Sequence, residues 1–171
     1  MSSRDSVLRP IAVPWKISSS VGLLESKLEL SSNDDRRLLL RLGVYYPETD
    51  WNRDRIVEVV LEQIQFLKWH SDIVFEDYHP LNAYDSQHIP EYRDSLGRLS
   101  LGQYEFYKEW KLSGICPDSS AYEVAPSQLI QEWTEPRREG LRHYVFVFDD
   151  SVVEAVSTGM TWRFEDDLAA Q

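Results

Sequence analysis

The stretch from Arg142 to Trp162 constrains the fold of this chain most strongly. Residues 144–148 are apolar on both faces of an extended chain, and a second apolar run, residues 152–157, follows after Asp149, Asp150 and Ser151. Two β-branched and aromatic runs separated by three small polar residues predict a β-hairpin. A strand that is apolar on both faces belongs in the middle of a covered sheet. We therefore expect the hairpin 144–157 to form the centre of the core.

The length of 171 residues and the 42% of hydrophobic residues predict a single domain, residues 1–171, with a core of its own. Pro10 and Pro14 predict an irregular N-terminal arm over residues 1–19, which Trp15 would attach to the body of the protein. Residues 165–171 are expected to form an acidic tail. The sequence has neither a signal-peptide apolar region nor an apolar run of the length that a membrane helix needs, so a cytoplasmic protein is expected.

Two further segments favour strands. Leu24, Ser26, Leu28 and Leu30 alternate with charged residues, which predicts a half-buried strand; residues 38–44 continue as a second strand after a polar turn. Residues 51–75 are ambiguous, because apolar side chains fall at helical spacing over 51–67 while many of them are β-branched. Strands with a tight break near Glu62 and Gln63 are the favoured interpretation, and a helix remains the alternative.

Residues 77–99 are rich in Asp, Tyr, His, Pro and Ser, which predicts a long loop. Tyr104, Phe106, Trp110 and Leu112 suggest an extended aromatic segment, and Ser127 offers an N-cap for one short helix near 127–134. The predicted fold class is α+β, mainly β. Its antiparallel sheets would pack as a sandwich or a flattened barrel.

Charge indicates the kind of partner. The net charge of −11 disfavours direct binding to nucleic acid, because affinity for phosphates comes from Lys and Arg. Between Tyr144 and Gln171 six carboxylates accompany one arginine. If the hairpin turn and the tail lie together, these carboxylates would attract a basic protein; otherwise they only keep the protein soluble. The candidate partner-binding residues are Asp149, Asp150, Glu154, Glu165, Asp166 and Asp167.

Sites for metal ions or catalysis have weaker support. His70, Asp72 and Glu76 would share one face of a strand and, with Asp77 and His79, are weak candidate metal ligands, although their spacing matches no compact metal motif. Glu76 with His79 or His88, or His143 with Glu154, would serve as acid–base pairs only if buried together. The single cysteine, Cys116, is expected to be a packed thiol. No catalytic residue and no cofactor is predicted.

Several C-terminal elements together resemble a known pattern. They are Tyr122-Glu123-Val124, then Ser127 with Leu129-Ile130 and Trp133, then His143-Tyr144-Val145-Phe146 with Asp149 and Val153-Glu154-Ala155. This pattern is similar to one in small uncharacterised bacterial proteins, some of which look like immunity or accessory proteins. The resemblance covers the last third of the chain and brings no catalytic residues with it.

Two functions are therefore expected. The first is a non-enzymatic interaction protein, such as an immunity-type or regulatory inhibitor, that binds a basic protein partner through an acidic surface. The alternative is a small-molecule-binding or metal-dependent β domain that uses the loop 77–99. The sequence leaves enzymatic activity undecided and favours its absence.

Overall fold

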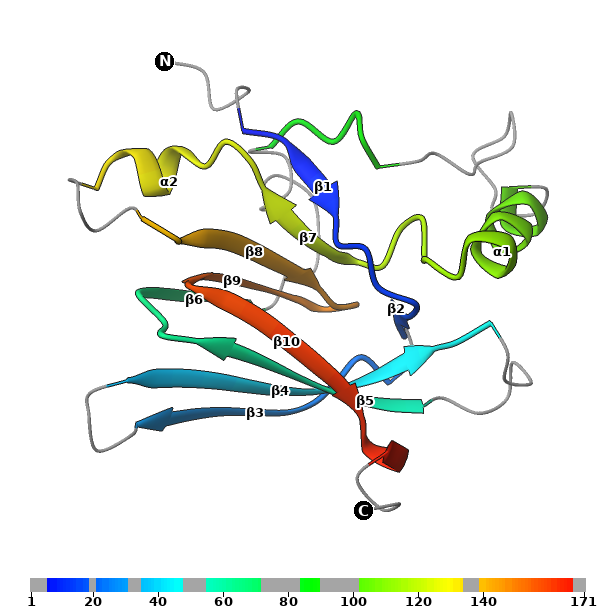
Figure 1. Cartoon of the computed structure of the whole chain (residues 1–171), viewed down its shortest axis with the longest axis horizontal. Helices are drawn as coiled ribbons and strands as arrows, with labels where there is room; N and C mark the ends of the chain where they lie inside the picture. The colour runs from blue at the N-terminus through cyan, green and yellow to red at the C-terminus, as the bar shows by residue number, and fades with distance from the viewer. Residues whose placement is uncertain are drawn as a thin grey trace.

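The strands form two antiparallel sheets that pack face to face (Figure 1). A computed structural model describes residues 6–18, 21–30, 35–47, 55–71, 84–89, 102–133 and 139–167. The first sheet has the order β1 (Leu8–Pro10), β7 (Ala121–Val124), β8 (Arg142–Val147), β9 (Ser151–Ser157) and β6 (Phe66–Ser71). The second has the order β10 (Gly159–Phe164), β5 (Arg55–Glu62) and β4 (Arg36–Tyr45), and both β2 (Lys16–Ile17) and β3 (Leu23–Leu30) pair with β4. The mainly β α+β class is thus confirmed as a sandwich whose sheets do not close into a barrel.

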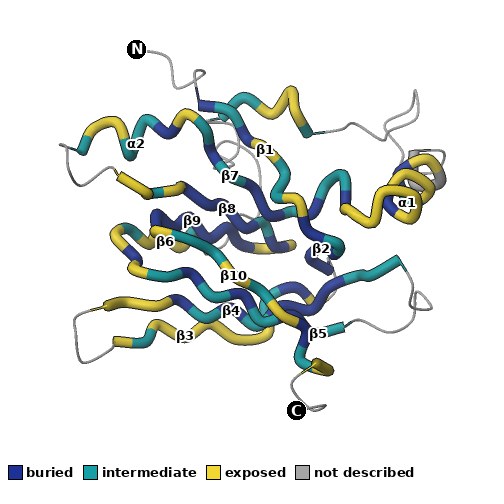
Figure 2. Tube along the Cα trace, viewed as in Figure 1, coloured by how far each residue is buried: buried dark blue, intermediate teal, exposed yellow. Residues whose placement is uncertain are grey.

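The hairpin β8–β9 lies in the middle of the first sheet, as the sequence predicts. Tyr144, Phe146 and Val153 point into the space between the sheets and are buried with residues of β4 and β5. Val145 and Val152 point to the outer face, where they are buried against Tyr122 and other side chains of a second cluster. Figure 2 shows the buried residues concentrated in these central strands. Both faces are covered, which explains why the hairpin is apolar on both sides.

Residues 55–62 and 66–71 form strands, which confirms the favoured interpretation for this part of the segment 51–75; residues 51–54 and 72–75 lie outside the described residues. The break lies where it was expected, at Gln63, whose φ of 49° turns the chain sharply between β5 and β6. β5 belongs to the second sheet and β6 to the first. The chain crosses between the two sheets a second time from β9 to β10, and only Thr158 lies between these strands. The backbone bond from Thr158 N to Glu62 O, 3.0 Å, joins the two corners.

The prediction of an extended segment at 104–112 was wrong, because these residues lie in α1 (Gly102–Ser113). Phe106 and Trp110 are four residues apart, which places them on one face of a helix, and both are buried beside Cys116. Leu112, which an extended chain would have placed with them, is 80% exposed. The ring of Trp110 donates a hydrogen bond from Nε1 to Pro14 O at 2.9 Å, which fixes α1 to the N-terminal arm.

The one predicted helix, near 127–134, is present as α2 (Gln128–Gln131), and the Ser127 side chain accepts from Ile130 N as an N-cap. A 3₁₀ turn, η3 (Glu165–Asp167), begins the acidic tail. The described chain therefore holds two α-helices where one was expected. None of its helices has the length and apolar character that crossing a membrane requires.

Two expectations about the first thirty residues need correction. The arm 1–19 is not wholly irregular, because β1 and β2 pair with β7 and β4; Trp15 is fully buried, as expected. β3 forms the predicted hairpin with β4 but is not half-buried, since Leu24, Leu28 and Leu30 are 44%, 51% and 72% exposed. The physical reason is its position at the sheet edge, where the first sheet does not cover it (Figure 2).

Candidate functional site

A buried carboxylate lies on the outer face of the first sheet. Glu154 belongs to the central strand β9 and is 8% exposed. The neighbouring strands bring two imidazoles to the same face, because His70 of β6 pairs with Val152 and His143 of β8 pairs with Val156. Both pairing positions are two residues from Glu154, on the same side of the pleat. The register of three strands therefore places two histidines around one acid.

Each carboxylate oxygen of Glu154 has a polar contact. Its Oε2 lies 2.9 Å from His70 Nε2, and its Oε1 accepts a short hydrogen bond from the Tyr84 hydroxyl. His143 Nε2 approaches Oε1 at 3.7 Å, which is too long for a hydrogen bond. We call Glu154, His70, Tyr84 and His143 the Glu154 cluster. Tyr84 comes from residues 84–89, the described part of the loop predicted at 77–99; the rest of that segment lies outside the described residues.

The surroundings of His143 favour one tautomer. Its Nδ1 lies 3.0 Å from Ser127 Oγ, and the same oxygen accepts from Ile130 N. The Ser127 hydroxyl can donate to Nδ1 or accept from it, but the Glu154 carboxylate beside Nε2 favours a neutral His143 with its proton on Nε2. That Nε2 is buried, points towards Glu154 and has no hydrogen-bond partner among the described residues.

Opposing effects set the charges of the cluster. Burial favours the neutral form of Glu154, but hydrogen bonds from Tyr84 and His70 and the nearby imidazoles outweigh it, so its pKa lies below the ordinary value of 4.5. Burial lowers the pKa of His143 below 6.5, against the attraction of Glu154. At neutral pH the cluster therefore holds an ionised carboxylate beside a neutral His143.

Ser127, His143 and Glu154 follow one another as hydroxyl, imidazole and carboxylate. This resembles the order of groups in a nucleophilic triad, but Ser127 is 7% exposed and its oxygen already caps α2. A buried capping oxygen has no open side from which to attack a substrate. The arrangement can store, orient or exchange a proton, and it does not present a nucleophile.

The predicted metal set is only partly covered by the structure. Of its members, His70 belongs to the cluster, while Asp72, Glu76, Asp77 and His79 lie outside the described residues. Within the described ranges no three His, Cys, Asp or Glu side chains are arranged to hold a metal ion. Glu76 and His79 belong to the other acid–base pairing that was predicted, and they too lie outside these ranges. His88 is exposed.

Cys116 is a packed thiol, as the sequence predicts. It is 1% exposed and lies against Phe106 and Trp110. Burial raises its pKa to about 12, which keeps the thiol protonated at neutral pH. It is therefore unsuited to act as a nucleophile.

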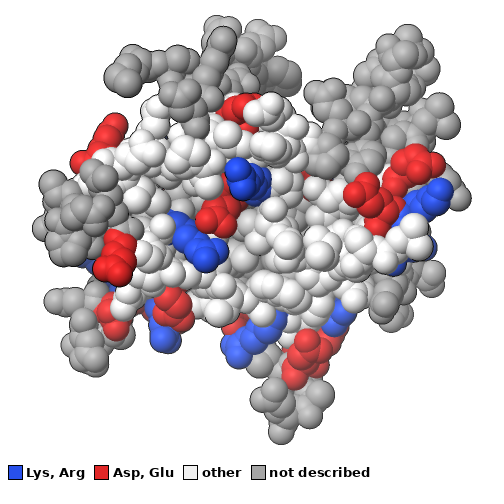
Figure 3. Space-filling model, turned by 45° about the horizontal axis from the view of Figure 1, so that its top comes forward, with Lys and Arg blue, Asp and Glu red and all other residues white. Residues whose placement is uncertain are grey.

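The structure separates the acidic residues that were predicted to bind a partner. Glu154 is buried, Glu165 pairs with Arg41, and Asp166 lies 3.5 Å from Arg55. Figure 3 shows other acidic and basic side chains side by side over one face of the molecule. Asp149 and Asp150 are exposed on the β8–β9 turn, and Asp167 is exposed on η3; among the described residues these three form no ion pair. No described contact joins the turn to η3.

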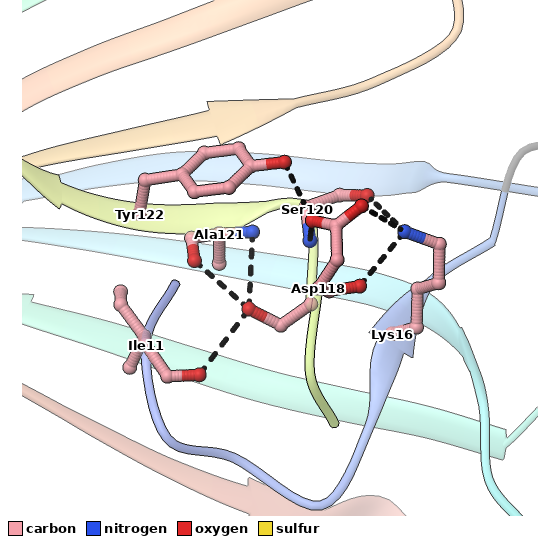
Figure 4. A network of polar contacts seen from close by, with 7 residues as sticks. Ile11, Lys16, Asp118, Ser120, Ala121 and Tyr122 are labelled. Atoms are coloured by element: carbon pink, nitrogen blue, oxygen red, sulfur yellow. Dashed lines mark hydrogen bonds and ion pairs between the residues drawn. The ribbon is translucent and has the colours of Figure 1, made fainter. Parts of the chain in front are cut away.

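The acidic turn borders a shallow hollow of about 230 Å³. Its lining includes Ile17, Tyr45, Phe148 and Asp149, and it also includes Lys16. The Lys16 ammonium is already engaged, since it donates to Asp118 O and Ser120 Oγ, both at 2.8 Å, and lies 3.2 Å from Asp118 Oδ2 (Figure 4). Its charge is therefore offset within its own network, which leaves Asp149 at the edge of a mostly apolar depression.

The sequence predicts His143 and Glu154 as a candidate pair, and the structure buries them together, but the sequence predicts His70 only as part of the metal set. The available signal was the strand register, because placing β6 beside β9 puts His70 next to Glu154. Tyr84 had no such signal, since it lies in a segment without periodicity. Comparisons of the chain with protein-family models, with curated proteins and with solved structures found no match.

Proposed function

We propose that this protein is a non-enzymatic interaction protein, of the immunity or regulatory-inhibitor type, that binds a basic protein partner in the cytoplasm. One observation carries the proposal: Asp149 and Asp150 project from a hairpin turn, without ion pairs among the described residues, beside a hollow with apolar walls. Charge attracts a partner, and an apolar recess gives its side chain a place to bind.

The chemistry of the hollow fits a lysine or an arginine. The aliphatic stem of such a side chain would lie against Tyr45 and Phe148, and its charged end would reach Asp149 or Asp150. The turn is closed by a backbone bond from Phe148 N to Ser151 O, 2.8 Å. The structure records no bond from either aspartate side chain to the described backbone, so both carboxylates are available to a partner.

The test compares two variants with the same change in charge. Asp149→Asn/Asp150→Asn removes the carboxylates of the turn, and Asp166→Asn/Asp167→Asn removes two exposed carboxylates of η3. Each variant and the wild type are used to capture partners from native lysate at several salt concentrations. We expect the turn variant to lose a stoichiometric basic partner that the η3 variant retains, and we expect the wild-type complex to weaken with salt.

Equal loss in both variants would attribute binding to net charge and not to the turn. Capture of the same partner by all three proteins, with no effect of salt, would contradict the proposal. Unfolding curves identify any loss of folding, which we expect to be absent because exposed substitutions usually change stability by no more than about 0.5 kcal/mol.

The Glu154 cluster favours a second candidate, a site for a small polar ligand next to the loop 77–99. The observation behind it is His143 Nε2, a buried donor that points at a carboxylate without reaching it. A ligand hydroxyl or a water could bridge the two groups. Elemental analysis of tag-free protein and thermal shift with divalent ions and small polyols test this candidate; a Glu154→Gln variant should lose any shift that the wild type shows.

A further inference from the structure

We propose that the protein self-associates through β3, as a symmetric dimer in which two copies of this strand pair in antiparallel fashion. β3 pairs with β4 on one side, and no described strand lies on the other. Leu28 and Leu30 on this strand are more than half exposed, at 51% and 72%. An edge strand with exposed apolar side chains is a template for pairing with another strand.

The exposed leucines continue the apolar face of the second sheet. Leu28 lies opposite Leu38 and Ser26 lies opposite Leu40, and both β4 leucines are buried. The side chains at 26, 28 and 30 therefore share the face that is directed towards the core. Beyond the bulge between Leu23 and Glu25, the pairing of β3 with β4 is regular up to Leu30. Residues 25–30 thus form a regular edge that a further strand can extend.

The charge pattern of β3 favours β3 of a second copy of the chain as the strand that pairs with it. A two-fold axis perpendicular to the sheet must pass through one residue of β3, which then faces itself. If that residue is Lys27 or Glu29, like charges face each other. If it is Leu28, each Lys27 faces Glu29 of the second copy, and this attractive pair occurs twice.

The remaining charge-compatible choice places the axis at Ser26, where Glu25 would face Lys27 of the second copy. That register extends the pairing across the bulge between Leu23 and Glu25, and bulges interrupt strand pairing. The register centred on Leu28 uses residues 26–30 and avoids the bulge. It also brings the two Leu28 side chains together on the core-facing side and places each Leu30 opposite Ser26.

The size of the interface predicts a weak dimer. A stable protein interface typically uses about 20–30 residues from each side, whereas one strand supplies far fewer. We therefore expect a dimer that forms with rising protein concentration and dissociates on dilution. It would leave the acidic turn free, because Asp149 and Asp150 belong to the other sheet.

Charge reversal tests the register. Lys27 and Glu29 form an exposed pair at 2.7 Å within one strand, and Glu29 also lies opposite Arg37 of β4. Exchanging them removes one exposed cross-strand attraction but should leave the fold intact. Lys27→Glu alone should weaken dimerisation at least about tenfold in sedimentation equilibrium, because two attractive cross-strand pairs become repulsive. Glu29→Lys alone should do the same. The double variant Lys27→Glu/Glu29→Lys should restore the wild-type affinity.

Cysteine crosslinking tests the axis independently. Under oxidation Leu28→Cys should form a disulfide-linked dimer, because the two residues at 28 face each other. Leu30→Cys is the matched control: it is more exposed than position 28, but its two copies lie too far apart to be joined. The native Cys116 is buried and should not contribute.

Three results would overturn the proposal: a wild-type protein that stays monomeric throughout the concentration series, a double variant as weak as the single variants, or equal crosslinking at 28 and 30. The first result, a protein that stays monomeric, includes the case in which β3 pairs with an extended peptide of another protein.

Discussion

Replacing Glu154 with leucine tests whether the Glu154 cluster holds the fold together. The substitution removes the acceptor for Tyr84 and His70 and the charge that faces His143. A buried donor left without a partner costs about 1–3 kcal/mol. Tyr84 and His70 are only partly covered, so water will satisfy some of this loss. Because two donors lose their acceptor and water satisfies only part of the loss, we expect Glu154→Leu to cost about 2–4 kcal/mol.

The assay is equilibrium unfolding in urea at neutral pH, with two companion variants. Glu154→Gln keeps one acceptor oxygen and should cost about 1–2 kcal/mol. Glu123→Leu is the control, because Glu123 is a half-exposed carboxylate 3.6 Å from Arg142 and should cost less than about 1 kcal/mol. A loss below about 1 kcal/mol for Glu154→Leu would refute the reasoning. A Glu154→Gln variant more stable than the wild type would show that the carboxylate is kept at the expense of stability, which would favour the ligand-binding candidate.

Three further predictions follow from buried groups. Because the pKa of His143 is lowered in the folded protein, His143 is protonated more readily in the unfolded chain as the pH falls. The free energy of unfolding should therefore fall as the pH drops below 6.5. Urea titrations of the His143→Asn variant should lack this part of the fall. Trp110→Phe should cost about 1–2 kcal/mol in urea unfolding through the lost bond to Pro14, and Trp110→Ala about 3–5 kcal/mol through the cavity. With its pKa raised to about 12, Cys116 should react with a thiol reagent at pH 8 at least about 1,000-fold more slowly in the native than in the denatured protein.

The sequence predicted best those segments in which burial and local preference agree. The hairpin 144–157 is rich in β-branched and aromatic residues and is buried on both faces, so pattern and environment point to one structure. The prediction of an extended segment where α1 lies was wrong because the aromatic residues of this segment fit both an extended and a helical spacing. β3 misled for another reason: alternation shows that a strand has two different faces, but it does not show whether another sheet covers the apolar one.

The candidate site was less predictable than the fold because it depends on which strands become neighbours. His70 and Glu154 are 84 residues apart in the chain, and only the pairing of β6 with β9 brings them together. The acidic set shows the opposite limitation. Its members are close in sequence, yet Glu154 is buried on the outer face of the first sheet while Asp149 and Asp150 remain on an exposed turn.

The paired corners at Gln63 and Thr158 have a consequence for how the molecule unfolds. β5 and β10 lie side by side in the second sheet, and their continuations β6 and β9 lie in the first. The bond from Gln65 N to Val156 O, 2.8 Å, ties the two passages together on the side of the first sheet. The pair β5–β6 and the pair β9–β10 thus run side by side through both sheets. Separating these strands in one sheet strains their continuations in the other. Amide protons of β5 and β9 should therefore exchange through one shared opening event, with a single free energy and not one for each sheet.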